Sequence, residues 1–377
     1  EAVGPTRAMF GSDMPILRMR MRRIEENNTY VNLVPPGLYG DVSGDPHMRE
    51  VSKEEGEKLT VPRPKDEVRR EVVWPDLVAR DNSIEDLQET YRLLFPGKDV
   101  SALMFISKVH SVESAKANNA YLADASRRSG WPALYYSHPT QSPDELEARI
   151  REGGFLGLKS YLSLSPAYLP EAEIRIFDFF PKNQLKRMDE LGAIVMLHIP
   201  RNGRLKDPVN LEQILEIKRE FPHIRLIIAH VGRAYTYGDV GNAFTDYLCK
   251  APDLMYDFSA NCCEYAITEV IRHAGPKHVM YGTDMPILRM RTHRIEENGT
   301  YINLVPPGLY GDPSQDRHLR EVSAEEAEKI TFFVYEELLA FKRACTTLGM
   351  TKNDVADMMY NNARELIDGA RRSIYGK

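Results

Sequence analysis

The sequence predicts an α/β protein of the (β/α)8 TIM-barrel class. Three observations favour this class: short apolar runs recur roughly every 25 to 40 residues, amphipathic segments separate them, and the runs are apolar almost throughout. Parallel strands need crossover helices between them, and strands covered on both faces lose the alternation of polar and apolar side chains. A barrel of parallel strands surrounded by helices satisfies all three observations.

Seven strands are expected in the part of the chain that follows Asp81. They cover residues 100–109, 132–137, 155–160, 193–198, 224–230, 254–258 and 278–284. A barrel needs an eighth strand, which must come from residues 1–80; residues 8–12 are the better candidate and residues 72–74 the weaker one. A doubly wound open sheet is the competing architecture, but no Gly-rich phosphate loop follows the first strand.

Helices are expected between and after these strands. Residues 143–152 follow Ser142, a suitable N-cap, and residues 211–220 show a second helical pattern. Near the end of the chain, residues 332–348 form a strongly amphipathic pattern, and the segment 351–354 opens another helix with the spacing of a capping box.

Composition restricts the partners of the protein. With 377 residues, 42% hydrophobic and 28% charged, the chain can bury a sizeable core. A net charge of -6 without a basic stripe gives no support for nucleic-acid binding, so a small-molecule substrate is expected. The longest apolar stretches fall far short of the roughly 20 residues that span a bilayer. Four cysteines without a C-x-x-C pair indicate a reducing compartment, which we expect to be the cytoplasm.

A partial duplication is the most unusual feature of the sequence. Residues 4–60 align without a gap on residues 275–331, and 41 of the 57 aligned positions are identical. Two domains are therefore expected: residues 1–60, a copy of 272–331 that packs on the barrel or completes it, and residues 61–377, the barrel itself. A natural fusion and an artefact of gene assembly both explain the duplication, and the sequence does not decide between them.

Polar side chains follow several of the expected strands. In a barrel of parallel strands, these positions meet at one end, where the chemistry takes place. Two imidazoles and a carboxylate that converge there suit Zn²⁺ or a similar divalent ion, which lowers the pKa of a bound water. The residues at these positions are His110, His138, Lys159, His198, His230, Asp257 and Asp284.

The motifs around these residues resemble a known family. GFLGLKS, VMLHIP, LIIAHVG, MYGTDMP and MMYNNARELI follow one another in the order found in the amidohydrolase-related branch of the amidohydrolase superfamily, over residues 83–367. The resemblance implies a TIM barrel with one or two metal ions. It also implies that His198 is the strand-five ligand, His230 the strand-six histidine, and Asp284 both a metal ligand and the general base.

The chain departs from the family at one point. Members of the family carry an H-x-H pair at the end of the first strand, and none of the ten histidines of this chain lies two residues from another. If the duplicated GSDMP motif occupies the place of the first strand, Asp13 supplies one oxygen ligand instead. The expected metal is zinc, with manganese or iron as alternatives, and an empty site is the remaining possibility.

Further side chains are candidates for substrate binding. Lys159 has three interpretations: a carbamylated bridge between metals, a cation that holds a substrate carboxylate, or a structural lysine; the second is favoured. Arg201, Arg204 and Arg233 follow His198 and His230, and a guanidinium can grip a carboxylate with two hydrogen bonds. Of these arginines, Arg201 and Arg233 are expected to bind substrate, together with His138.

The loop 289–311 carries Pro306-Pro307-Gly308 and is long for a segment without secondary structure of its own. Such loops are often lids or binding loops. A contact between subunits of a homo-oligomer is the alternative.

Three functions follow from these observations. The first is a metal-dependent hydrolase that acts on a small carboxylated amide, ester or lactone. The second is a non-oxidative decarboxylase that uses the same site. The third is a catalytically silent barrel, because the H-x-H ligands are absent.

Overall fold

The computed structural model describes residues 21–27, 29–59, 77–79, 82–106, 112–166 and 169–376. The chain divides into two units, one made of Glu1–Val68 and Pro166–Pro170, the other of Arg69–Ser165 and Glu171–Lys377. Each unit is described by itself.

The larger unit contains a parallel sheet of six strands, which pair in chain order. Met104 adds a parallel bridge to Ala133 on the β4 side of this sheet. The alternation of strands and helices and the uniformly parallel order are those of a TIM barrel, as predicted. The six strands are β4 (Tyr135–Tyr136), β5 (Gly157–Lys159), β6 (Ile194–Leu197), β7 (Arg225–Ile228), β8 (Met255–Asp257) and β9 (Val279–Met280).

Six of the seven predicted strands are confirmed with shorter bounds, and the prediction for residues 100–109 was too long. In its described part, 100–106, only Met104 pairs with a neighbouring strand, donating to the carbonyl of Pro132 and accepting from the amide of Leu134. Both candidates for the eighth strand, residues 8–12 and 72–74, lie outside the described residues.

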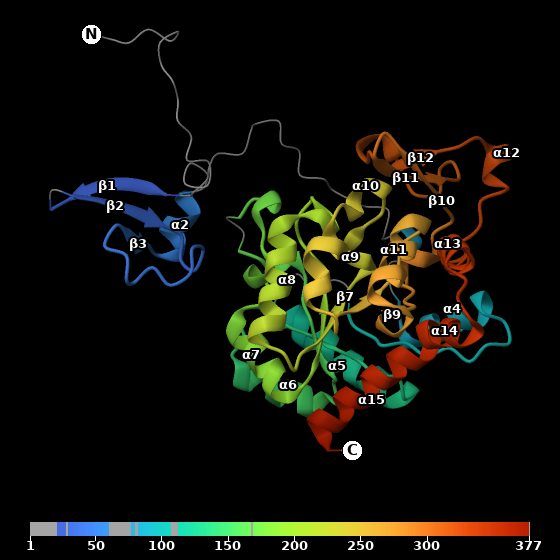
Figure 1. Cartoon of the computed structure of the whole chain (residues 1–377), viewed down its shortest axis with the longest axis horizontal. Coiled ribbons are helices and arrows are strands. Elements are labelled where there is room, and N and C mark those ends of the chain that lie inside the picture. The colour runs from blue at the N-terminus through green and yellow to red at the C-terminus, as the bar shows by residue number, and fades with distance from the viewer. Residues whose placement is uncertain are drawn as a thin grey trace, which may run out of the picture. The chain divides into compact units, whose positions relative to one another are not determined.

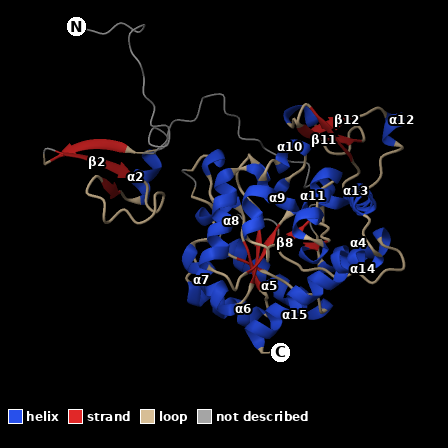
Figure 2. Ribbon diagram, viewed as in Figure 1, coloured by secondary structure: helices blue, strands red, loops and turns tan. Residues whose placement is uncertain are grey.

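Helices surround the strands of the larger unit, as Figure 2 shows. The predicted N-cap is confirmed, because the Ser142 hydroxyl accepts from the amide of Glu145. The predicted capping box is also present, with Thr351 and Asp354 bonding reciprocally at the start of α14 (Lys352–Ala356). The other main helices are α4 (Ile84–Leu94), α5 (Val112–Ser129), α6 (Pro143–Gly153), α7 (Lys182–Leu191), α8 (Pro208–Glu220), α11 (Glu264–Ala274), α13 (Phe333–Leu348) and α15 (Asn362–Tyr375). None of the described helices combines the length and the apolar composition needed to cross a membrane.

The C-terminal helix α15 packs on the sheet next to the strand beginnings. Ala370 belongs to the same buried cluster as Leu134, Leu156 and Ile194. The Tyr375 hydroxyl hydrogen-bonds to the carbonyls of Ile150 and Phe155, which precede β5. The opposite ends of the strands, which carry the polar residues, are thus left for chemistry.

Gly157, the first residue of β5, allows two strands to approach closely. Its φ is 151°, and a Cβ built there would lie 1.9 Å from the carbonyl oxygen of Ile194 on β6. Only glycine fits this position, because any other residue would place a carbon inside the neighbouring backbone.

The duplicated sequence folds twice into the same structure. In the larger unit, β10 (His293–Glu297) and β11 (Thr300–Val305) form a hairpin, and β12 (Leu319–Glu321) pairs parallel to β11. We call residues 292–323 the cap module. In the smaller unit, β1 (Arg22–Glu26), β2 (Thr29–Val34) and β3 (Met48–Glu50) pair in the same order and at equivalent positions, followed by α2 (Lys53–Lys58). We call residues 21–59 the N-terminal module.

The prediction that residues 289–311 have no secondary structure of their own was wrong. Asn298 and Gly299 both have positive φ, 51° and 71°, which is the conformation of a type I′ turn. This turn matches the twist of the two strands it joins, so an Asn-Gly pair between alternating apolar residues is a strong hairpin signal. The sequence contained that signal in RIEENGTYINLV.

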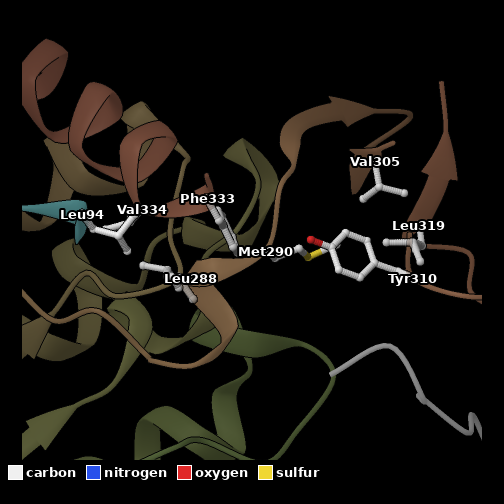
Figure 3. Close-up of a cluster of buried hydrophobic side chains, with 9 residues drawn as sticks. Leu94, Leu288, Met290, Val305, Tyr310, Leu319, Phe333 and Val334 are labelled. Carbon is white, nitrogen blue, oxygen red and sulfur yellow. The ribbon is translucent and has the colours of Figure 1, made fainter. Parts of the chain in front are cut away.

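A buried cluster attaches the cap module to the rest of its unit. Figure 3 shows Met290 between Phe333 on α13 and Tyr310, with Val305 and Leu319 on the far side of the tyrosine ring. The Tyr310 hydroxyl also accepts from the amide of Arg291. The module is therefore fixed relative to the end of β9 that carries Asp284.

Candidate active site

Four of the predicted site residues lie at the C-terminal ends of neighbouring strands. Lys159 ends β5, His198 follows β6, His230 follows β7, and Asp284 lies beyond β9. Parallel pairing places these strand ends along one edge of the sheet, which we call the mouth of the barrel (Figure 1). Lys159 and His198 are buried, with 5% and 8% of their surfaces exposed.

Asp257 and Ser259 orient His230. The backbone amide of His230 donates to Asp257 Oδ1 over 3.0 Å, and the Ser259 hydroxyl donates to the same oxygen over 2.5 Å. His230 Nδ1 lies 2.9 Å from the carbonyl oxygen of Ser259, which can only accept a hydrogen bond. Nδ1 therefore carries the proton, and Nε2 keeps a lone pair for a substrate, a water or a metal.

The backbone is strained where the site residues lie. His230, Val231, Gly232 and Arg233 have φ values of 57°, 49°, 59° and 59°, so the short turn α9 (His230–Arg233) has left-handed conformations throughout. Asp284 also has a positive φ, 43°. Strain of this kind persists only where the surrounding structure holds it, and it concentrates at functional sites.

His198 is a neutral imidazole in a largely aromatic environment. Its ring centroid lies 5.4 Å from that of His230 and 4.7 Å from that of Tyr161. Burial, and then the positive charge of Arg233, hold the pKa of His198 well below its ordinary value. Nδ1 of His198 is buried and has no hydrogen-bond partner within the described structure, so it is available to a ligand.

Lys159 and Asp284 are buried groups of opposite charge whose pKa values shift toward each other. Burial lowers the pKa of Lys159 to about 8, although Asp257 and Asp284 act in the other direction. Burial raises the pKa of Asp284, with His230 as the strongest opposing influence. The ammonium of Lys159 lies 5.4 Å from the centroid of the Phe105 ring. A base and an acid that both titrate nearer to neutral pH are suited to proton transfer.

Replacing Lys159 with Met tests whether the buried charge has a cost to folding. Unfolded lysine has a pKa of 10.5, so below pH 8 the folded protein bears the full cost of burying the cation, about 3 kcal/mol. We expect Lys159→Met to increase the free energy of unfolding at pH 7, as measured by urea denaturation. The wild-type protein should become more stable between pH 8 and 10.5, where the unfolded chain binds more protons, and the variant should lack this rise.

The exposed Lys116 is a suitable control. Lys116→Met should change the free energy of unfolding by less than about 0.5 kcal/mol. Equal effects of the two substitutions would show that burial does not make Lys159 costly.

The described residues do not complete a metal site. No group of three or more His, Cys, Asp or Glu side chains in the described parts of the chain lies in an arrangement that could hold an ion. His198, His230 and Asp284 match in number the three protein ligands of a catalytic zinc site, but these described side chains do not converge as such a site requires. Asp13, the predicted additional ligand, lies outside the described residues, as does His110.

The predicted substrate-binding arginines differ in their surroundings. Arg201 is paired with Asp207, the N-cap of α8, and Arg204 with Asp239 at 2.6 Å. Among the described residues, Arg233 donates only to backbone carbonyls, those of Ile199 and Pro200. Of the three guanidiniums, Arg233 is therefore the one whose charge is not already used by a carboxylate of the described residues.

His138 contacts a different set of residues. Its Nδ1 lies 2.7 Å from the Thr140 hydroxyl, and its backbone amide donates to Gln141. With Tyr135 and Glu145, it lines a small cavity of about 30 Å³. A role of His138 in substrate binding stays a prediction.

Aromatic side chains and one further arginine complete the mouth, and sequence reasoning did not identify them. The guanidinium of Arg294 lies 5.0 Å from the Tyr235 centroid and 4.5 Å from the Tyr301 centroid. The Tyr161 ring lies against His198, tilted by 47°. These residues come from loops and from the cap module, where no strand pattern marks them as neighbours of the site.

A sequence profile of a family described as amidohydrolase matches residues 107–368. This range includes Lys159, His198, His230 and Asp284, and covers most of the chain. None of the curated proteins compared with the chain matches it.

Several solved structures resemble the chain at low sequence identity. A 4-oxalomesaconate hydratase from Rhodopseudomonas palustris is 15% identical, with a TM-score of 0.49 over 80% of this chain and 88% of the hydratase. A 5-carboxyvanillate decarboxylase from Sphingomonas paucimobilis is 12% identical, with a TM-score of 0.41 over 78% and 93% of the two chains. A protein assigned as a 2-pyrone-4,6-dicarboxylic acid hydrolase from Pseudomonas putida is 16% identical, with a TM-score of 0.38 over 67% and 78%. Identities and scores of this size do not transfer an activity.

Proposed function

The chain belongs to the amidohydrolase family, and from this premise we propose that it hydrolyses a small carboxylated ester, lactone or amide at the mouth of its barrel. One observation carries the proposal. A buried cation, Lys159, and a buried carboxylate, Asp284, influence each other's pKa beside an imidazole, His230, whose Nε2 lone pair is free. This set can bind an acidic substrate and move a proton.

Asp284 is the general base of the proposed reaction. It takes a proton from the attacking water, which requires the carboxylate to be ionised and within hydrogen-bond reach of that water. Burial raises the pKa of Asp284, so the carboxylate holds a proton more strongly than an exposed aspartate does. His230, held in one tautomer by Ser259, accepts a second hydrogen bond from the water through Nε2.

Lys159 and Arg233 bind the substrate carboxylate in this proposal. Lys159 is cationic below pH 8, and Arg233 is cationic at every pH of interest. Both cations lower the pKa of His198, which shows that their fields reach the same imidazole. A substrate carboxylate placed between them brings the bond to be cleaved close to Asp284.

The purified protein can be tested with a panel of carboxylated esters, lactones and amides in water enriched in ¹⁸O. Hydrolysis should place one ¹⁸O in the product acid, and mass spectrometry detects it. Release of CO2 from an acid, without ¹⁸O in the product, would instead support the decarboxylase alternative. A protein that is folded and binds these compounds but converts none of them would support the catalytically silent barrel.

The pH dependence of kcat/KM provides a second test. Because the cationic form of Lys159 is needed and is lost as the pH rises through about 8, kcat/KM should fall about tenfold per pH unit above that value. In Lys159→Arg the alkaline decline should move to higher pH, since arginine stays protonated. An alkaline decline at the same pH in both proteins would assign it to another group.

The four cysteines are free thiols in the structure. Burial raises the pKa of Cys262, as expected for an unreactive buried thiol. We propose on this basis that the protein works in a reducing compartment, such as the cytoplasm. Its assembly into a homo-oligomer stays a prediction.

A further inference from the structure

We infer that the cap module determines substrate selectivity by placing Arg294 and Tyr301 at the mouth of the barrel, where they bind a second carboxylate of the substrate. This inference rests on the proposed function, since it concerns the part of the substrate that lies away from Asp284. It assigns a role to side chains outside the reaction centre.

Arg294 joins the cap module to the barrel. It lies on β10, and its guanidinium donates through Nη1 to the carbonyl oxygen of Ala260 over 2.8 Å. Ala260 belongs to the loop that follows β8, which ends at Asp257, and this loop also carries Ser259. The same guanidinium lies 4.4 Å from the centroid of Phe333 on α13. Contacts with Ala260 and with Phe333 thus fix the position of the guanidinium.

The charge of Arg294 is not neutralised locally. Its described hydrogen bonds go to an amide oxygen, Asn303 Oδ1, and to the Ala260 carbonyl, and none of its described ion-pair contacts involves a carboxylate. Arg233 is in the same situation, whereas Arg204 is paired with Asp239. Two half-buried guanidiniums that find no counter-ion among the described residues favour binding of an anion, because a buried charge is costly until it is paired.

The charges of Arg233 and Arg294 both act on Tyr235. Burial raises the pKa of Tyr235, and Arg233 and Arg294 both oppose this rise. Arg233 donates to the carbonyls of Ile199 and Pro200, which follow His198, and Arg294 donates to the carbonyl of Ala260, which follows Ser259. The two cations therefore lie at the mouth of the barrel next to different loops, Arg233 at the loop after β6 and Arg294 at the loop after β8. A substrate with two carboxylates can contact both.

The N-terminal module is an internal comparison for the geometry of this arginine. There, Arg23 lies 4.3 Å from the Tyr30 centroid and donates through Nε to Asn32 over 2.9 Å. In the cap module, the corresponding distances are 4.5 Å to Tyr301 and 2.8 Å to Asn303.

The stack continues in both modules with a histidine. Tyr30 stacks on His47 with centroids 4.2 Å apart, and Tyr301 on His318 at 4.1 Å. In each module the stack is built from the module's own residues, and in the cap module Ala260 and Phe333 add further contacts to Arg294. A guanidinium ordered before the ligand arrives loses little entropy on binding, which favours affinity.

The test compares Arg294→Met with Arg23→Met, the same substitution at the duplicated position. Binding of benzoate and of the ortho, meta and para benzenedicarboxylates is measured by isothermal titration calorimetry, which needs no turnover. The wild-type protein should bind at least one dicarboxylate more tightly than benzoate. Arg294→Met should weaken the binding of that dicarboxylate about tenfold or more and change the affinity for benzoate less than about twofold. The loss of one charged hydrogen-bonded contact accounts for such a difference. The circular dichroism spectrum of the variant should be unchanged. Arg23→Met should leave the affinities for benzoate and for the dicarboxylate unchanged.

The outcomes separate this inference from the proposed function. Equal losses for benzoate and the dicarboxylate, or equal effects of the two substitutions, would overturn the inference even if hydrolysis is found. No hydrolysis, with the selective loss in Arg294→Met, would overturn the proposed function alone. Arg294→Lys, which keeps the charge but loses the planar fork, should recover only part of the dicarboxylate affinity; full recovery would contradict a bidentate contact. If Arg294→Met alters the spectrum, Arg294→Lys provides the deciding comparison.

Discussion

Asp284→Asn is expected to lower kcat by about 10²- to 10⁴-fold while the protein stays folded. The amide has the size of the carboxylate but cannot take a proton from water, and general-base catalysis typically contributes a factor of this order. The backbone should tolerate the change, because Asp284 has a φ of 43° and asparagine is among the residues that adopt positive φ most readily. Steady-state kinetics and thermal unfolding of the same preparation measure both effects.

The duplication supplies a matched substitution for this experiment. Asp13 occupies in the first copy the position of Asp284 in the second, and it is the predicted additional ligand of the site. If Asp13 serves the site, Asp13→Asn should also lower the activity and any zinc, manganese or iron content found by elemental analysis. Unchanged turnover in Asp284→Asn would remove the central assignment of this site.

Gly157→Ala is expected to destabilise the protein by more than about 3 kcal/mol or to prevent folding. The added carbon would lie 1.9 Å from the carbonyl oxygen of Ile194, so β5 and β6 could not keep their pairing. The backbone cannot relax easily, because both strands are buried between their neighbours in the sheet. Urea denaturation followed by circular dichroism measures the loss.

Gly154→Ala is the control that separates the steric clash with Ile194 from the cost of placing alanine at a positive φ. Gly154 ends α6 with a φ of 75°, but no atom lies within 4 Å of a Cβ built there. That substitution should cost only about 1 kcal/mol, the usual cost of a left-handed alanine. If Gly157→Ala cost no more than Gly154→Ala, the close approach of β5 and β6 would have no energetic importance.

The existence of the strands was predictable because their apolar runs are continuous. The first and last residues of each strand were less predictable. The predicted run 193–198 ends with His198, whereas β6 ends at Leu197. Lys159, by contrast, is still paired with Met196 at the end of β5. The sequence shows where a polar residue follows an apolar run but not where strand pairing stops.

The reaction centre was more predictable than the walls of the site. Lys159, His198 and His230 each terminate a run, so their meeting follows from parallel pairing alone. Arg294 and Tyr301 lie far along the chain from Tyr235, and their meeting depends on how the cap module packs. Neither periodicity nor spacing encodes such contacts, although the Asn-Gly pair did signal the hairpin that carries them.

The self-contained stack of the cap module has a consequence for how selectivity can change over generations. Because Arg294, Tyr301 and His318 all belong to the cap module, recombination can exchange this one segment without changing the catalytic residues. Libraries confined to residues 293–305 should therefore yield altered ligand preference at little loss of catalytic competence. If the duplication is a natural fusion, the second copy offers spare genetic material for such exchange, because substitutions can accumulate in one copy while the other remains in use.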